Sequence, residues 1–371
     1  MPAISSPFLC GARSVAQIMQ LVLLACLPAL AFSTWFFGIG LLLNLILASL
    51  TALLMESLVC LLRARSITFT LSDYSVLVTA MLLSFAIPHG APWWIPVSGT
   101  AFAVLIGKHV YGGLGYNLFN PAMVGYVALL VSFPLEMTAW HIPSAARTAA
   151  EQAAPLSLEG MLITLQLSFP FLQDSIGGNM TTGADGFAMA TPLIEYKFAA
   201  PSAIHRAWMD NTSPFLRTAF ARSAETGWEW INLGFFAGGL FLLWQRIISW
   251  HIPVAVLGSL GILSWLFYQP GSEAVYGSPY LHLFISATMI GAFFIATDPV
   301  TAPASPRARL AYGCLIGIAI YTLRIRGNYL DSVGFAILLG NLFAPGLDRL
   351  LPTRVYGKSS KWFPLRRRST P

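Results

Sequence analysis

A polar segment, Asp185-Gly-Phe-Ala-Met-Ala-Thr191-Pro192, carries a hydroxyl group in a setting that suggests chemistry, within a chain that is otherwise apolar. Pro192 has a fixed φ and disfavours helix at the residue before it, so Thr191 is expected in an extended conformation or a turn. The hydroxyl is then presented to its surroundings and is not packed inside a helix. Taken by itself, the Ala-Thr-Pro spacing is also that of an ordinary loop turn, which is the simpler interpretation.

A second candidate site combines glycines with asparagines between two apolar segments. Its residues are Gly112, Gly113, Gly115, Asn117 and Asn120, the last followed by a proline. Glycine adopts positive φ readily and lets the backbone come close to a planar ligand. Asparagine side chains both donate and accept hydrogen bonds, as an isoalloxazine ring or a quinone carbonyl requires. A tight connecting loop is the alternative, and both interpretations stay open on these residues alone.

A third polar segment, Thr297-Asp298-Pro299, ends another apolar run. Its structural interpretation is a helix stop, because proline cannot continue the helical hydrogen-bond pattern. Its functional interpretation is that Thr297 and Asp298 contact the polar edge of a flavin or a quinone. The expected topology puts this segment in the same layer as the glycine segment, on the cytoplasmic side.

Glu56 is the acidic residue that lies clearly inside an apolar run. A charge within a membrane segment is costly and usually functional. Glu56 is therefore a candidate for coupling to a proton or a sodium ion. Pairing with a neighbouring subunit is the alternative.

Cysteine and histidine spacing predicts no metal site in this chain. The four cysteines stand far apart without a Cys-x-x-Cys pair, and the six histidines are scattered. An iron–sulfur cluster or a structural zinc needs several such ligands together. No glycine-rich dinucleotide or phosphate-binding motif is present either. An electron carrier must therefore be held in another way.

The composition predicts an all-α integral membrane protein. Of the 371 residues, 56% are hydrophobic and 10% charged, whereas soluble domains carry about 25% charged residues. Apolar runs of roughly 20 residues suit helices that cross a hydrocarbon core of about 30 Å, and a barrel would show alternating strands instead. Ten spans are expected, at residues 15–35, 37–62, 72–88, 94–110, 119–135, 227–245, 250–268, 280–297, 309–325 and 330–349.

Basic residues set the expected orientation, because arginine and lysine concentrate on the cytoplasmic side. Both termini are predicted to be cytoplasmic, with the acidic loop 136–226 in the periplasm. The basic tail 351–371 marks the membrane side and does not indicate binding of nucleic acid. Basic residues at span ends agree with this orientation at Arg13, Arg63, Arg65, Lys108, Arg246, Arg307 and Arg309. Arg324 and Arg326 fall on the far side and need a partner, for which Asp331 or a flavin phosphate is suggested.

A weak internal repeat divides the chain into two halves. Three pairs of segments match in order, 79–85 with 287–293, 101–111 with 311–321 and 125–130 with 334–339. The third to fifth spans therefore correspond to the eighth to tenth. Since five spans is an odd number, the second copy must be inverted, as in many transporters. The predicted repeats are residues 1–135 and 227–350, although chance matching among apolar letters is the alternative.

The motifs together resemble one known family, which unites the D subunit of Rnf electron-transport complexes with the B subunit of sodium-pumping NADH:quinone reductases. Similar segments run along nearly the whole chain, at residues 5–7, 111–123, 185–191, 288–301 and 354–357. The resemblance implies that Thr191 carries FMN through a phosphoester, within a motif that includes Asp185, Ala190 and Pro192. Ala188 departs from the pattern, because the family usually has a hydroxyl residue there. The Rnf protein is the better fit, since the sequence lacks the longer N-terminal extension of its reductase counterpart.

The resemblance implies a flavoprotein of the bacterial inner membrane that relays electrons within an ion-translocating complex. Its expected cofactors are covalent FMN and a second flavin, riboflavin, among the spans. The expected partners are a second subunit with covalent FMN, iron–sulfur subunits and the flavin transferase that modifies Thr191. The complete complex would couple ferredoxin and NAD chemistry to sodium or proton movement, or reduce a redox-sensing regulator. The inverted repeat alone would suit a small-solute transporter or channel, which leaves the flavinylation motif without a role.

Overall fold

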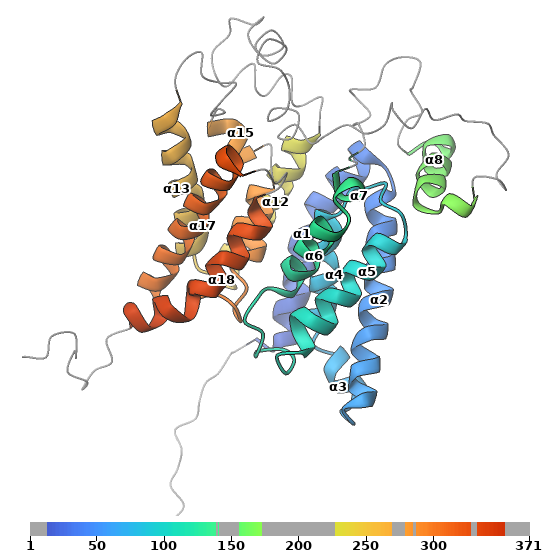
Figure 1. Cartoon of the computed structure of the whole chain (residues 1–371), viewed down its shortest axis with the longest axis horizontal. Helices are drawn as coiled ribbons and strands as arrows, with labels where there is room; N and C mark the ends of the chain where they lie inside the picture. Colours follow the sequence, from blue (N-terminus) through green and yellow to red (C-terminus); the bar gives the residue numbers. More distant parts are fainter. Residues whose placement is uncertain are drawn as a thin grey trace, which may run out of the picture.

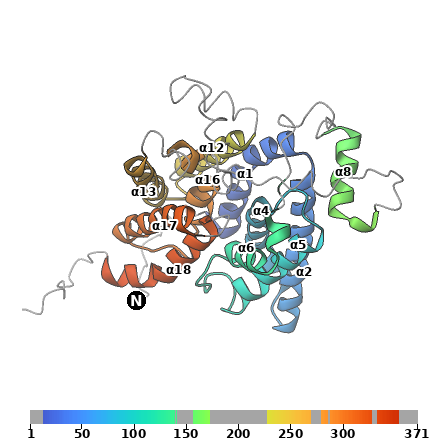
Figure 2. The same ribbon diagram turned by 45° about the horizontal axis from the view of Figure 1, so that its top comes forward.

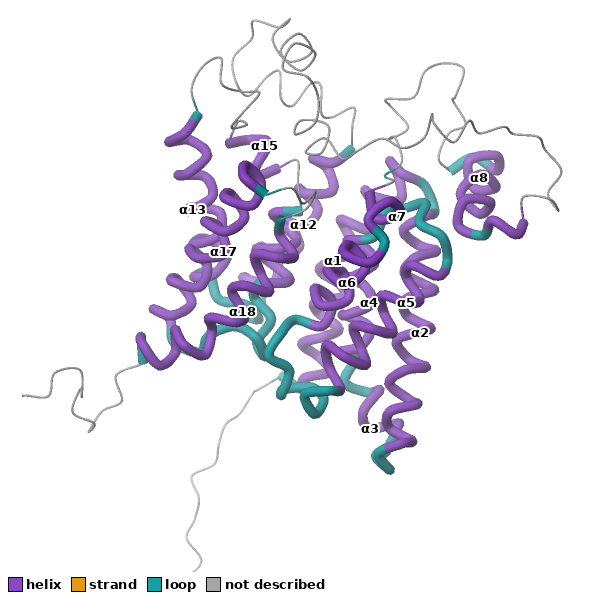
Figure 3. The backbone as a smooth tube through the Cα atoms, in the orientation of Figure 1, coloured by secondary structure: helices purple, strands orange, loops and turns teal. Residues whose placement is uncertain are grey.

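The computed structural model describes residues 13–138, 140, 156–172, 227–268, 279–284, 287–327 and 332–352, and the regular elements in these ranges are helices (Figure 1, Figure 3). Four helices are long and apolar enough to cross a membrane, namely α1 (Val15–Phe37), α2 (Gly40–Leu62), α17 (Pro306–Arg326) and α18 (Val333–Leu350). The predicted all-α membrane fold is confirmed. The count of ten spans and the division into two inverted repeats stay predictions.

The first group of helices consists of α1, α2 and the shorter helices that follow them. These are α3 (Ile67–Leu71), α4 (Ser75–Ala86), α5 (Trp94–Phe102), the π-helix η1 (Ala103–His109), α6 (Pro121–Ser132) and α7 (Pro134–Thr138). Part of the predicted periplasmic loop is also helical, as α8 (Leu158–Ser168) and the 3-10 turn η3 (Pro170–Leu172). In Figure 1 this group runs from blue to green, and α8 lies at its periphery.

The second group of helices ends with α17 and α18. Before them come α12 (Trp228–Trp244), α13 (His251–Phe267), α15 (Pro279–Phe284), α16 (Thr288–Ile290) and the π-helix η4 (Gly291–Ile295). Figure 1 and the turned view in Figure 2 both show the two groups side by side. They are joined by contacts of α1 with α12 and of α6 with α18. Each pair consists of helices that the expected repeat makes equivalent.

The junction between the two groups depends on small residues. Gly238 of α12 lies so close to α1 that an added Cβ would stand 2.0 Å from the carbonyl oxygen of Ala25. Membrane helices approach closely through such residues, which increases the dispersion contacts between their backbones. Within the second group, α17 uses Gly317 in the same way against α13, where an added Cβ would stand 2.7 Å from the Val256 carbonyl oxygen.

Two helices widen into π-helix just before the segments that carry the candidate motifs. In η1 the Val110 N–H donates to the Leu105 carbonyl, and at the end of η4 the Ala296 N–H donates to the Gly291 carbonyl at 2.8 Å. Such bonds to the fifth preceding residue are rare and often occur at functional sites. Each widened turn leads directly into a loop that borders the same cavity.

Candidate functional site

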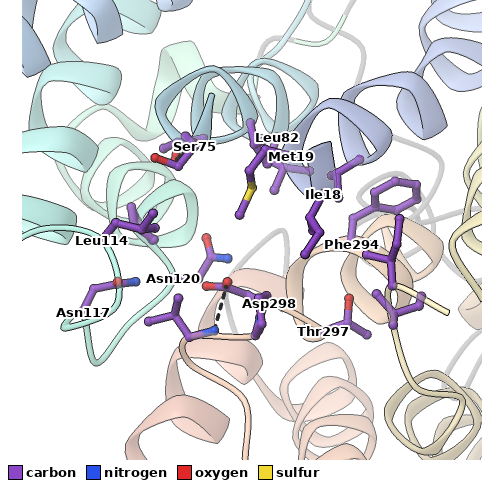
Figure 4. Close-up of a pocket in the computed structure, with 18 of the residues that line it drawn as sticks. Ile18, Met19, Ser75, Leu82, Leu114, Asn117, Asn120, Phe294, Thr297 and Asp298 are labelled. Atoms are coloured by element: carbon purple, nitrogen blue, oxygen red, sulfur yellow. Dashed lines mark hydrogen bonds between the residues drawn. The ribbon is translucent and has the colours of Figure 1, made fainter. Parts of the chain in front are cut away.

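A cavity of about 140 Å³ lies where the two helical groups meet (Figure 4). Polar residues from two distant segments border it together, Asn117 and Asn120 from the loop after η1, and Thr297 and Asp298 from the loop after η4. Apolar side chains complete the walls, among them Ile18, Met19, Leu82, Leu114 and Phe294. A mostly apolar cavity with a few convergent polar groups is the common form of a small-molecule site.

The two asparagines differ in what they leave for a ligand. Asn120 caps α6, because its Oδ1 accepts hydrogen bonds from the Ala122 N–H at 3.0 Å and the Met123 N–H at 3.3 Å. Asn117 donates from Nδ2 to the Phe119 carbonyl at 3.1 Å, while its buried Oδ1 has no hydrogen-bond partner among the described residues. A buried acceptor without a donor is costly. A ligand with an N–H or O–H group at this position would remove that cost.

The three glycines shape the loop that carries Asn117. Gly112, Gly113 and Gly115 have φ of +120°, +108° and +89°, a range that L side chains rarely adopt. They are absent from the described lining of the cavity, to which the same loop contributes Leu114 and Asn117. Direct contact of the glycines with a ligand stays a prediction. Their observed role is to turn the backbone so that its neighbours border the cavity.

Two arginines at the end of α2 hold this loop in place. Arg63 donates to the His109 carbonyl at 2.8 Å, and Arg65 donates to the Gly112 carbonyl at 3.3 Å. In the sequence analysis both arginines are interpreted as markers of the cytoplasmic side. The structure gives them a further role, since they attach the glycine loop to a long helix.

Asp298 and Thr297 behave differently although they are adjacent. Thr297 donates to the Phe293 carbonyl of its own helix at 2.6 Å, which caps the end of η4. Asp298 accepts two long bonds, from the Val300 N–H and the Thr301 hydroxyl, both at 3.3 Å. Burial raises the pKa of the Asp298 carboxyl to about 6, although these two bonds oppose the shift. Asp298 can therefore accept from a ligand donor when ionised and donate when protonated.

Lys108 is the charged residue in the described cavity lining that the sequence interpretation missed. From the sequence, Lys108 is expected to be a surface charge at the end of a span. In the structure it lines the cavity and is only 4% exposed. Its Nζ donates to Glu56 Oε1 at 2.8 Å and to Ser75 Oγ at 3.0 Å. The signal was present in the sequence, because a buried acid such as Glu56 needs a cation at the same depth.

Glu56 lies at the centre of a buried ionic cluster, which also contains Lys108, His109 and Ser75. Glu56 is fully buried, and its second oxygen, Oε2, lies 2.9 Å from His109 Nε2. Both oxygens therefore have partners from within the chain. Glu56 therefore does not need a partner from a neighbouring subunit, which was the alternative interpretation. The role of Glu56 in ion coupling stays a prediction.

A second buried cation lies at the opposite end of the helices. Arg324, in the last turn of α17, donates to the His282 carbonyl at 2.7 Å and to the Thr288 hydroxyl at 2.9 Å. It thereby bridges α15 and α16. Asp331, suggested as its partner, lies outside the described residues.

The predicted flavinylation motif lies outside the described residues, and this includes Asp185, Ala190, Thr191 and Pro192. The attachment of FMN to Thr191 therefore stays a prediction from the sequence.

Comparison with known proteins gives a match along nearly the whole chain. The chain matches the NQR2, RnfD, RnfE family over residues 3–357. It is 46% identical over 359 residues to the D subunit of the ion-translocating oxidoreductase complex of Salmonella paratyphi A, which covers 95% of this chain and 97% of that relative. The proteins of the same name from Salmonella typhimurium and Salmonella newport are equally similar, at 46% identity and the same coverage. The similarity thus spans both loops that border the cavity.

Proposed function

The chain belongs to the NQR2, RnfD, RnfE family, and on that premise we propose that it is the D subunit of an ion-translocating oxidoreductase complex that relays electrons through bound flavins. The name shared by its relatives supports the assignment to such a complex. The chain is then one part of a larger enzyme. A second subunit with covalent FMN and iron–sulfur subunits supply and remove the electrons.

One observation carries the flavin proposal, which is that two distant motifs border a single cavity. Asn117 and Asp298 lie far apart in the sequence, yet both line the junction between the two helical groups. A helix stop and a connecting loop would each explain one motif. Neither explains why polar residues of both motifs border the same cavity.

The polar groups of the cavity fit an isoalloxazine ring better than a quinone. The unpartnered Asn117 Oδ1 needs a donor, and Asp298 has two long bonds that a better donor could replace. An isoalloxazine ring offers an N–H as well as acceptors, whereas the oxidised quinone ring offers carbonyl acceptors. Lys108 can supply a donor to a ring acceptor. A bound flavin supplies the electron-transfer chemistry that these side chains lack.

Covalent FMN at Thr191 is the second part of the proposal. The resemblance of residues 185–191 to the family motif supports it, together with the extended conformation that Pro192 favours. A phosphoester would prevent loss of FMN into the periplasm, where the loop 136–226 is expected. It would also keep the ring near its electron donors and acceptors. The flavin transferase is the partner that makes this bond.

The remaining parts of the proposal concern orientation and ion coupling. We place the chain in the bacterial inner membrane with both termini in the cytoplasm, following the basic residues at the span ends. The complex moves sodium or protons, and the candidate coupling group in this chain is Glu56.

In-gel fluorescence of the denatured protein, co-expressed with a flavin transferase, tests the covalent site. We expect a fluorescent band from the wild type and from Thr182→Ala, a nearby threonine control, and no band from Thr191→Ala. Absence of fluorescence from the wild type, with the transferase active on another target, would contradict covalent FMN and point to Ala188 as the cause.

Extraction of non-covalent flavin tests the cavity separately. Protein that carries Thr191→Ala is purified in lipid nanodiscs, and its flavin is released by denaturation and measured by chromatography. We expect close to one flavin per chain, and at least a tenfold weaker retention after Asn117→Leu. Asn232→Leu is the matched control. Asn232 is also buried, donates to the Trp228 carbonyl and has an Oδ1 with no partner among the described residues, but it lies in α12 away from the cavity lining. Equal loss in both variants would contradict a specific role of Asn117.

A further inference from the structure

Lys108 and Glu56 form a charge pair with one member on the cavity wall and the other behind it. Lys108 lines the cavity, whereas Glu56 is fully buried and absent from the described lining. Lys108 is the one cation and Asp298 the one acid among the described lining residues. We propose that Lys108 and Glu56 set the reduction potential of the ring in the cavity in opposite directions. This inference rests on the proposed flavin in that cavity.

The geometry leaves one donor of Lys108 available to the cavity. An ammonium group has three N–H donors. Two of them are used by Glu56 Oε1 at 2.8 Å, which is absent from the described lining, and by Ser75 Oγ at 3.0 Å, from a residue that also lines the cavity. The third has no described partner within the protein. The cation is therefore fixed in place by its neighbours while one N–H stays free for a ligand.

Reduction adds negative charge to a flavin ring, so a nearby cation favours the reduced form and a nearby anion disfavours it. Both effects are large here, because the side chains of Lys108 and Glu56 are almost completely buried and water does not screen them. The Lys108 charge lies closer to the cavity than the Glu56 charge. Together they give the ring a small positive field, whereas either charge alone would give a strong one.

A purely structural ion pair predicts a different result. Removing either member of a buried pair leaves an uncompensated charge, so both single changes would destabilise the protein in the same direction. The potential of a ring that merely lies nearby would then change little. Opposite shifts in potential from the two single changes are specific to the electrostatic role.

The test is a spectroelectrochemical titration of the flavin bound to the full chain in nanodiscs, in a Thr191→Ala background. Lys108→Met should lower the ratio of reduced to oxidised ring at a fixed potential by about tenfold or more, which corresponds to about 59 mV for a one-electron step. Glu56→Gln should raise the same ratio by about tenfold. Lys108→Arg keeps the charge and should stay within about threefold of the parent.

The double variant Glu56→Gln/Lys108→Met keeps the test decisive if one single variant folds poorly. It removes both charges without leaving either one unpaired, and its potential should lie between those of the two single variants. Shifts of the same sign, or no shift in a variant that retains the ring, would overturn the inference. Loss of the ring from both single variants, with the ring retained in the double variant, would show a purely structural pair and also overturn the inference. A parent protein without extractable flavin would instead overturn the proposed cavity ligand, and this inference with it.

Discussion

Two buried cations in the described part of the chain, Lys108 and Arg324, lie near opposite ends of the helical bundle and have different kinds of partners. Lys108 pairs with the carboxylate of Glu56 and borders a cavity. Arg324 donates to two neutral acceptors, the His282 carbonyl and the Thr288 hydroxyl. The lysine end thus combines compensated charge with access to a ligand. The arginine end uses one planar group to connect two short helices.

Burial of a cation therefore does not by itself indicate a ligand site. Arg324 bridges the short helices α15 and α16, where its guanidinium can bond two acceptors at once. Lys108 lies in the widened turn η1, beside a cavity. We therefore expect changes at Lys108 to affect both stability and ligand chemistry, and changes at Arg324 to affect stability alone.

The largest expected effect is the loss of stability in Lys108→Met. This change leaves the carboxylate of Glu56 buried beside His109 alone, and breaking a buried ion pair costs about 3–5 kcal/mol. Thermal unfolding in detergent would measure it. The double variant Glu56→Gln/Lys108→Met should recover most of the loss, because no charge is left unpaired. A double variant as unstable as the single variant would contradict this explanation.

Arg324→Met should destabilise the protein by at least about 3 kcal/mol, because a hydrogen bond to a charged group contributes roughly 1.5–3 kcal/mol and at least two are lost. Flavin retained in the cavity should keep the potential of the parent protein. Arg324→Lys should recover only part of the stability, since an ammonium lacks the planar fork of the guanidinium. A shift in flavin potential in Arg324→Met would break the distinction between the two ends.

Gly238→Ala should cost about 1–3 kcal/mol through overpacking of the helix junction. The added methyl would meet the Ala25 carbonyl oxygen at 2.0 Å, so α1 has to move. Because α1 contributes Ile18 and Met19 to the cavity, flavin retention should fall as well. Gly258→Ala is the matched control, since an added Cβ at Gly258 meets nothing within 4 Å. Equal effects of the two changes would contradict the close packing of α1 with α12.

The smallest expected effect is a dependence of stability on pH that comes from Asp298. Its pKa is raised to about 6 in the folded protein, above the ordinary value near 4, so the folded state binds this proton more tightly. The stabilisation is fully present below about pH 4 and is lost as the pH rises through about 6. Asp298→Asn should remove this part of the slope. Melting temperatures of the parent and the variant, measured across this pH range, would test this. The same slope in both proteins would contradict the burial of the carboxyl.

Local signals predicted several parts of the site from the sequence. The span expected at 119–135 contains α6, whose N-cap is Asn120 and whose first residue is Pro121, although the sequence interpretation did not assign a capping role to Asn120. The glycines at 112, 113 and 115 have positive φ, as expected of a tight loop. The expected spans overlap the described helices, although the eighth is divided among α15, α16 and η4, because length and hydropathy indicate where a membrane helix lies.

Features that depend on distant contacts could not be predicted in this way. The bond between Glu56 and Lys108 joins residues 52 positions apart, and nothing local distinguishes Lys108 from a surface lysine at a span end. The π-helical turns η1 and η4 have no clear composition signal. The sequence suggested that Arg324 needs a partner but could not show that a backbone carbonyl supplies it. Three-dimensional packing decided each of these features.

A density map of the purified protein with its bound chromophore would show whether a flavin ring occupies the cavity. We predict planar density for a flavin ring in the cavity between the two helical groups, in contact with Asn117, Asp298 and Lys108. A cavity occupied by side chains or lipid, in a sample from which non-covalent flavin can be extracted, would contradict the account.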